Sequence, residues 1–422
     1  MKNNAKKKLS REAEARLQLV MPLAEVVREE LREFVIGQGM AALGVMLEQE
    51  RSRLCGPAYE RGHGPKPSRA GSAQGELVMG GRRVRVKRPR VRDEQGEVAL
   101  PCWEDFSAAD PLDDRALEQM MVGVSTRKYE RSLEPLGAEV LGRGTSRSAV
   151  SRRFKAITEK RLNELLSQDL GGLPMAAIMI DGIHIEEHVI LIALGIDEGG
   201  QKHLLSLWEG ATEHHKVCLS LLQNLVRRNL DVQRSTLFVI DGSGALRKAI
   251  RTVFGEYAIV QRCQVHKVAN VRDHLPKEMH QSVRKAMRDA YQARSVAAAK
   301  TRLLALAKQL ATEHPGAAAS LREGLDETLT VQGMGLTKSL ERTLSTTNPI
   351  ENLNGGVRDV TRRVKRWRGG SMILRWVAAS ALDRQKTFRR LRGYRGMPTL
   401  VAFLRRNDAQ LHTDVDQAME VA

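Results

Sequence analysis

The spacing of hydrophobic and polar positions changes character along the chain. Between residues 174 and 266, short apolar runs bounded by Gly, Asp and Glu alternate with amphipathic stretches, a pattern typical of strands and helices that follow one another. It predicts strands over 176–185, 188–196, 202–208, 236–241 and 258–263, and helices over 213–229, over 244–254 and from near Gln264. Three successive strands followed by alternating helices and strands indicate an α/β fold.

The flanking segments are predicted to be mostly helical. Apolar residues at helical spacing, from Leu17 through Phe34, favour a helix over 16–54 after a basic arm. Helical patterns also cover 111–170 and the Ala- and Arg-rich segment 274–345, and the last long helix is expected to begin at Pro349.

The chain is strongly basic. Lys and Arg outnumber Asp and Glu by 68 to 50, a formal net charge of +18, which favours a nucleic-acid partner; a merely basic protein is the alternative. The four cysteines are scattered, which disfavours a disulfide framework and fits a reducing compartment. Neither a membrane span nor a signal-peptide core is recognisable. We therefore expect a cytoplasmic, nucleoid-associated protein without a membrane partner.

A basic strand is the first candidate for contacting DNA. In "GGRRVRVKRPRVR" the alternation Arg-Val-Arg-Val-Lys predicts a short strand with one cationic face. It would be either a phosphate-contacting ribbon or a solvated edge strand whose charges prevent aggregation.

The second candidate is a helix in "GRGTSRSAVSRRFKAITEK", capped by Thr145 or Ser146. Its apolar face holds Val150, Phe154 and Ile157. Its polar face holds the predicted DNA contacts Ser148, Ser151, Arg152 and Lys155. A turn followed by such a helix is how a helix-turn-helix presents its recognition helix. We expect that motif near 140–166, or else an ordinary basic surface helix.

Two carboxylates follow apolar runs of strand character: Asp181 in "AAIMIDG" and Asp241 in "TLFVIDG". An ionised carboxylate at the end of a buried strand is costly unless it is paired, and a divalent metal would justify two of them. Asp-Gly is also a common turn dipeptide, which is the alternative for either site alone. Asp197, in "ALGIDEGG", is excluded because it sits in a hairpin turn, about five residues, or roughly 16 Å, along the strand from Asp181.

Glu351, in "TTNPIENLNGG", is the third carboxylate. With Asn348 as N-cap and Pro349 at the first helical position, Glu351 fits a capping box and needs no metal for that role. It also leads a cationic stripe on the helix, which includes the predicted DNA contacts Arg358, Arg362 and Lys365. A carboxylate beside cations suits a metal ligand next to a phosphate backbone, and both roles are compatible.

"RCQVHKVAN" places Cys263 and His266 three residues apart at a strand-to-helix junction. The spacing suits zinc, but structural zinc needs four ligands and no second pair is nearby. A packing Cys with a His near the active site is favoured.

The motifs together resemble those of the Mutator-type DDE transposases of bacterial insertion sequences. The likeness covers about 100–395 and rests on "IDG" at 180–182 and 240–242, Cys263-x-x-His266, "TTNPIEN" at 346–352, the helical insertion before Glu351, and "GTSRSAVSRR". The resemblance implies a ribonuclease-H-like catalytic core, with Asp181, Asp241 and Glu351 ligating two Mg²⁺ (or Mn²⁺) ions. It further implies that Cys263, His266 and Asn348 support the active site.

The implied substrates are double-stranded DNA: the element's terminal inverted repeats and a target. One metal would activate water, and later a 3′-hydroxyl, while the other stabilises the leaving oxygen. A homodimer or higher oligomer on DNA is expected, and no small-molecule cofactor. The alternatives are another ribonuclease-H-like nuclease or resolvase, and a non-catalytic DNA-binding regulator.

These assignments divide the chain into five regions. They are an N-terminal helical region with its basic arm (1–60), a DNA-binding region (61–172), a catalytic core (173–273 with 346–395), a helical insertion (274–345) and a C-terminal tail (396–422).

Overall fold

The computed structural model describes residues 34, 37–59, 67–79, 82–108, 111–133, 142–143, 146–210 and 215–421. The chain divides into two compact units, Met1–Ile157 and Thr158–Ala422, and helix α4 (Arg147–Ser167) crosses the boundary. The predicted stripe from Leu17 to Leu31 and the predicted cap Thr145 lie outside the described residues. Within the described ranges, no helix combines the length and apolar character of a membrane span.

The first unit contains a twisted sheet in which β2 (Arg82–Asp93) is central. β1 (Ser68–Met79) pairs along one side of β2, and β3 (Gly96–Val98) and β4 (Gly142–Arg143) pair along the other. The alternative of an edge strand is therefore wrong, because β2 has paired strands on both sides. The valines of β2 are buried and its exposed positions are mainly Arg and Lys, so the predicted cationic face is present.

Helices complete this unit. Residues 37–55 are helical, and Leu43 and Leu47 pack with Leu77 and Val86 of the sheet. Two short helices follow, α2 (Pro101–Ala108) and α3 (Pro111–Met121). Ser146 caps α4 as predicted, because its Oγ accepts the N–H of Ala149 at 3.3 Å.

The second unit is built on a mixed sheet. Its strands are β5 (Met175–Ile185), β6 (His188–Asp197), β7 (Lys202–Gly210), β8 (Thr236–Ile240) and β9 (Ala258–Arg262). Their order is β7-β6-β5-β8-β9, with β7, β6 and β5 antiparallel and β8 and β9 parallel to β5. Each predicted strand is present with ends within two residues of the prediction, because the apolar runs are bounded by clear turn signals. The α/β class is confirmed.

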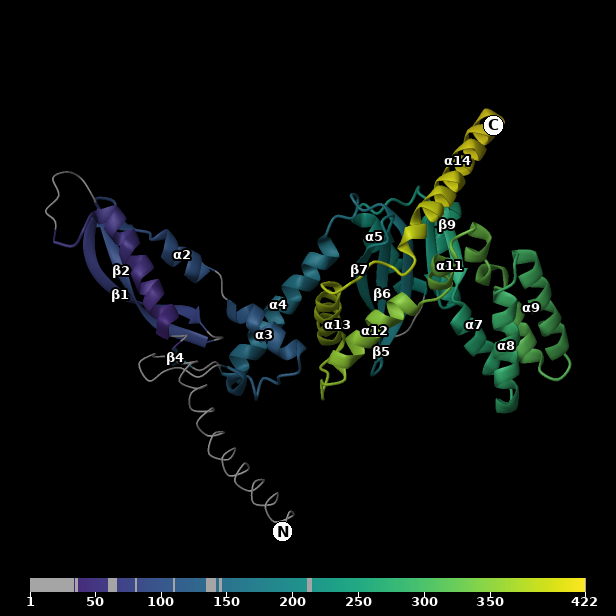
Figure 1. The fold of residues 1–422 in the computed structure, drawn as a ribbon, viewed down its shortest axis with the longest axis horizontal. Helices are drawn as coiled ribbons and strands as arrows, with labels where there is room; N and C mark the ends of the chain where they lie inside the picture. The colour runs from purple at the N-terminus through teal and green to yellow at the C-terminus, as the bar shows by residue number, and fades with distance from the viewer. Residues whose placement is uncertain are drawn as a thin grey trace, which may run out of the picture. The chain divides into compact units, whose positions relative to one another are not determined.

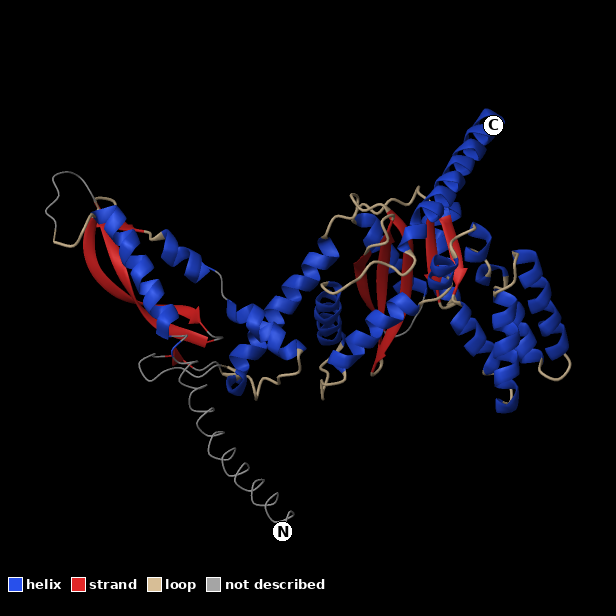
Figure 2. Ribbon diagram, in the orientation of Figure 1, coloured by secondary structure: helices blue, strands red, loops and turns tan. Residues whose placement is uncertain are grey.

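Helices cover both faces of this sheet (Figures 1 and 2). α5 (His215–Arg227) and α6 (Gly244–Phe254) pack on one face. α12 (Asn348–Thr361), α13 (Gly370–Gln385) and the first turns of α14 (Met397–Val421) pack on the other. Two helices thus follow the one that was expected to be the last. The segment predicted as a tail forms α14, where Met397 and Leu400 join the core.

A helical insertion separates β9 from α12. After α7 (Gln264–Arg272) come α8 (His280–Tyr291), α9 (Val296–Leu310), α10 (Pro315–Arg322) and α11 (Lys338–Leu344). Helices α7 to α10 enclose a core of their own. Short 3₁₀ turns lie at Glu130–Ser132, Gly255–Tyr257, Lys277–Met279, Asp326–Thr328, Val331–Met334 and Tyr394–Gly396.

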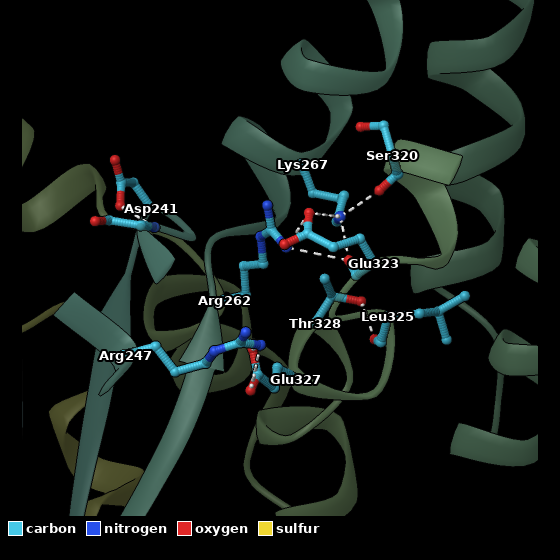
Figure 3. A network of polar contacts seen from close by, with 10 residues as sticks. Asp241, Arg247, Arg262, Lys267, Ser320, Glu323, Leu325, Glu327 and Thr328 are labelled. Atoms are coloured by element: carbon cyan, nitrogen blue, oxygen red, sulfur yellow. Dashed lines mark hydrogen bonds and ion pairs between the residues drawn. The ribbon is translucent and has the colours of Figure 1, made fainter. Parts of the chain in front are cut away.

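Buried cations fasten the insertion to the sheet (Figure 3). Arg262 Nη1, at the end of β9, lies 2.8 Å from Glu323 Oε2, and Lys267 Nζ lies 3.7 Å from the same oxygen. Lys267 also donates to the carbonyl oxygens of Ser320 and Glu323 at the end of α10. Arg247 on α6 pairs with Glu327 at 3.3 Å.

Candidate active site

The sheet register places Asp181 and Asp241 side by side. β5 and β8 pair in parallel up to Ile180 opposite Ile240, so the next residue on each strand carries a carboxylate at the same edge of the sheet. β8 ends there, and Asp241 Oδ1 accepts the N–H of Ser243 at 2.9 Å. The description of Asp181 as a carboxylate at a strand end is corrected, because β5 continues past it to Ile185 in a hairpin with β6, in agreement with the predicted strand 176–185.

Asp197 lies away from this pair, as expected. Its register partner on β5 is Met175, whereas Asp181 pairs with Ile192. Its carboxylate accepts the N–H of Gln201 and contacts His203 Nε2, both at 2.8 Å, which fixes the hairpin turn. The hairpin position predicted for Asp197 is therefore present in the structure.

Helix α12 brings Glu351 toward the two aspartates. Ile350, Leu353 and Val357 bury one side of the helix in the core. One turn after Glu351, Asn354 Nδ2 donates to Asp181 Oδ2 at 2.7 Å. Helix α12 is therefore bonded directly to β5 through Asn354, which the sequence reasoning had not singled out.

The start of α12 differs from the predicted capping box. The N-cap is Thr347, and Asn348 is the exposed first helical residue. Thr347 Oγ1 donates to Glu351 Oε1 at 2.5 Å, while the Thr347 N–H donates to Cys263 Sγ at 3.4 Å. The Glu351 carboxylate is thus not bonded to the N-cap amide, so its role as a backbone cap is not found.

Cys263 and His266 adjoin Glu351. Cys263 begins α7, and its N–H donates to the Ile240 carbonyl at 2.7 Å, which ties β9 to the end of β8. His266 Nδ1 lies 3.3 Å from Thr347 Oγ1, and His266 Nε2 lies 3.9 Å from Glu351 Oε1. Among the described residues, Cys263, His266 and Glu351 are the one group of three potential ligands whose ligand atoms all lie within 4.8 Å of one another. Three donors still fall short of a structural zinc site.

The site concentrates negative charge. Burial, followed by repulsion from Asp241, raises the pKa of the Asp181 carboxyl, and Glu351 adds to this. Hydrogen bonding to Cys263 raises the pKa of His266 to about 9, with smaller contributions from Glu351 and Asp241. Burial acts to raise the pKa of Cys263, but hydrogen bonds to His266 and Thr347 outweigh it and lower that pKa. Asp241 and Glu351 therefore lie close enough to both Asp181 and His266 to raise the pKa values of both.

Sequence comparison decides the family. Residues 12–390 match the family described as "Transposase, Mutator family". The chain belongs to the Mutator family of transposases. It is thus a DNA transposase, and the family implies an enzyme that cleaves and transfers DNA.

Three relatives named as transposases agree with this family. The chain is 26% identical over 391 residues to the transposase for insertion sequence element ISRM5 of Rhizobium meliloti (strain 1021), covering 90% of this chain and 91% of the relative. It is 30% identical over 250 residues to the transposase for IS6120 of Mycolicibacterium smegmatis, covering 58% and 75%. It is 26% identical over 352 residues to the transposase for IS256 in transposon Tn4001 of Staphylococcus aureus, covering 80% and 86%.

The predicted DNA contacts of this Mutator-family transposase lie on α4 and on or just after α12. On α4, Val150 and Phe154 are buried. The exposed face holds Ser148, Ser151, Arg152 and Lys155. Part of the segment before α4, residues 134–141 and 144–145, lies outside the described residues, so the helix-turn-helix stays a prediction.

On α12, only Arg358 of the predicted basic stripe lies within the helix. The helix ends at Thr361, so Arg362 is its C-cap and Lys365 lies beyond it. The predicted continuous stripe is wrong. Thr361 Oγ1 donates to the Val357 carbonyl, and the Val364 N–H donates to the Thr361 carbonyl in a tighter turn. Val360 and Val364, which the apolar pattern placed on the buried side of a longer helix, are only partly buried.

Proposed function

We propose that this transposase cuts and joins DNA strands with two divalent ions, Mg²⁺ or Mn²⁺, held by Asp181, Asp241 and Glu351. The observation that carries the proposal is the convergence of these carboxylates from three separate elements, with the pKa of Asp181 raised partly by the other two. Carboxylate oxygens are the donors that such hard cations prefer. Unlike the Cys263 and His266 group, with its sulfur and nitrogen donors, this set fits Mg²⁺.

The fold supports a ribonuclease-H-like catalytic core. The sheet begins with three antiparallel strands, and the next two strands are parallel to the first. The two aspartates lie on neighbouring parallel strands, and the glutamate comes from a helix packed across the sheet after an insertion. We propose the predicted core, 173–273 with 346–395, and the insertion, 274–345, as the corresponding parts.

The chain's own residues would hold the reacting groups in place. When bound, the ions would lower the pKa of an attacking water or 3′-hydroxyl and stabilise the leaving 3′-oxygen. The Ser243 amide fixes Asp241 and the Thr347 hydroxyl fixes Glu351. His266 supplies a positive charge beside Glu351, and with Cys263 and Asn348 we assign it a supporting role.

The substrates we propose are terminal inverted repeats and target DNA, bound as double strands at the nucleoid by a dimer or larger oligomer. The net charge of +18 supports an electrostatic interaction with phosphates. The exposed Arg152 and Lys155 of α4, and Arg358, Arg362 and Lys365 near α12, are the proposed contacts.

The test is cleavage and strand transfer on an oligonucleotide that carries the element's terminal repeat, with Mg²⁺ or Mn²⁺. The variants are Asp181→Asn, Asp241→Asn and Glu351→Gln. We expect each to lower the rate by roughly a thousandfold or more and to leave the salt-dependent Kd for DNA unchanged. Asp197→Asn is the matched control, because it changes a carboxylate of the same sheet outside the site.

Other results would select another function. If all three variants cut at the wild-type rate, the catalytic assignment fails. Cleavage without joining of the donor 3′-hydroxyl to a phosphodiester of the target would favour a ribonuclease-H-like nuclease or resolvase. Sequence-specific binding without cleavage under any metal condition would favour a regulator.

A further inference from the structure

We propose that Asn354 is a positioning residue for the metal site: it holds the Asp181 carboxylate in the orientation that presents one oxygen to the ions. This inference rests on the proposed function and extends it to a residue that none of the motifs had marked. It depends on three observations, namely the direction of one hydrogen bond, the place of Asn354 on α12, and a second polar atom of the same side chain.

The hydrogen bond has one possible direction. Asn354 Nδ2 lies 2.7 Å from Asp181 Oδ2, and an ionised carboxylate only accepts, so the amide nitrogen must face it. The bond engages Oδ2, so we assign Oδ1 to the ions; a backbone hydrogen bond from Gly182 to the same carboxylate helps to stabilise its ionised form. The bond from Asn354 also restrains the rotation of the Asp181 carboxylate.

The place of Asn354 on α12 links two proposed ligands. Asn354 follows Glu351 by three residues, so both side chains lie on one face of the helix, one turn apart. Glu351 is itself a proposed ligand, and Asn354 donates a hydrogen bond to Asp181 on β5. A single rigid element therefore sets the position of one carboxylate and the orientation of another.

The carbonyl of the same side chain has no protein partner. Asn354 is fully buried, and its Oδ1 is a buried acceptor without a hydrogen-bond partner in the described structure. Burying an unsatisfied carbonyl costs about 1–3 kcal/mol, so packing alone favours an apolar residue of the same shape. Mg²⁺ keeps several bound waters when it binds proteins, and such water would be a suitable donor. Polar groups behind metal ligands typically change metal affinity 10–100-fold when they are removed.

Asn354→Leu separates positioning from packing, because leucine keeps the shape and removes both polar atoms. We expect Mn²⁺ binding, measured by isothermal titration to the DNA-free protein, to weaken about 10–100-fold, with cleavage restored in part by a high Mn²⁺ concentration. Thermal unfolding in EDTA should be unchanged or shifted upward. Asn354→Asp is the second variant: it keeps the acceptor and loses the donor, and should unfold at a lower temperature in EDTA than with Mn²⁺.

Asn224 provides the matched control. It is also a buried asparagine of this unit, but its Oδ1 accepts from Ser206 Oγ and Arg228 Nη1. Ser206 lies on β7, which is separated by β6 from the strand β5 that carries Asp181. Asn224→Leu should lower the unfolding temperature and leave the Kd for Mn²⁺ within twofold of wild type.

The outcomes separate this inference from the proposed function. If Asp181→Asn abolishes Mn²⁺ binding while folded Asn354→Leu binds like wild type, the positioning role is wrong and the metal site stands. If neither variant changes Mn²⁺ binding, the proposed metal site itself is wrong. A loss of binding equal in Asn354→Leu and Asn224→Leu would reduce the effect to general destabilisation and overturn the inference.

Discussion

The second unit holds two clusters of charged side chains, one of carboxylates and one of cations, and they are compensated in different ways. At the carboxyl edge of β5 and β8, Asp181, Asp241 and Glu351 converge, and the charge of His266 offsets only part of theirs. At the junction with the insertion, Arg262 and Lys267 share Glu323, and Arg247 pairs with Glu327 (Figure 3).

The difference distinguishes the proposed metal site from a cluster that holds the fold together. Lys267 is wholly buried, and it is bonded to two carbonyls at the negative end of α10 as well as to a carboxylate. The protein therefore supplies the charge balance of the junction itself. The carboxylate cluster lacks such balance, which suits a site completed by cations from solution.

The largest expected contrast comes from removing one negative charge from each cluster. Asp181→Asn should leave the free energy of unfolding of the metal-free protein unchanged or raise it, because it relieves repulsion from Asp241. Glu323→Gln should lower it by about 2–4 kcal/mol, since it leaves two buried cations without their carboxylate; water around the half-exposed Glu323 keeps the loss below the upper range for buried pairs. Urea unfolding in EDTA measures both. If both variants lowered the free energy of unfolding, or both raised it, the distinction between the two clusters would be contradicted.

The second expected effect tests the contact between the clusters. Gly242 follows Asp241 with a φ of +111°, and a Cβ placed on it would lie 2.1 Å from Arg262 Nε. Gly242→Ala should therefore cost about 2–3 kcal/mol of stability and slow cleavage, because Arg262 and the Asp241 turn would both have to move. Gly244→Ala is the control, since nothing lies within 4 Å of its Cβ position. Equal unfolding midpoints for the two variants would show that Arg262 yields freely.

The sequence allowed the sheet and the aspartate pair to be predicted because both depend on local patterns. Apolar runs and turn residues mark the strands, and their order brings Asp181 beside Asp241. The interactions that escaped prediction are non-local. Thr347 donates a hydrogen bond to Cys263, although the whole insertion separates the two residues in the sequence. Lys267 on α7 pairs with Glu323, which lies inside the insertion. The sequence around each of these residues gives no indication of the residue to which it bonds.

The predictions of where α12 ends and of how β2 pairs failed for a related reason. The apolar spacing that begins at Ile350 continues to Val364, so periodicity alone extends the helix past its real end at Thr361. In "RRVRVKRPRVR" the alternation gives the two faces of β2 correctly, but it says nothing of how many strands lie beside it. Pairing with β1, β3 and β4 depends on segments that the pattern of one strand does not contain.

The smallest expected effect is a pH dependence of the structural cluster. Burial, then repulsion from Arg262, lowers the pKa of Lys267 to about 8 from its ordinary 10.5. Between these two values the unfolded chain binds more protons than the folded one, so this group's contribution to stability rises with pH. The penalty for charging Lys267 is fully present below pH 8.

Lys267→Met removes this titration and keeps the length of the side chain. The free energy of unfolding of the wild type relative to Lys267→Met should rise between pH 8 and 10.5, by on the order of 2–3 kcal/mol. Urea unfolding at several pH values measures it, and the difference between the two proteins cancels the titration of groups they share. A difference that stays flat or falls over this range would mean that Glu323 and the α10 carbonyls fully offset the burial of Lys267, and that the junction is even better balanced than its geometry indicates.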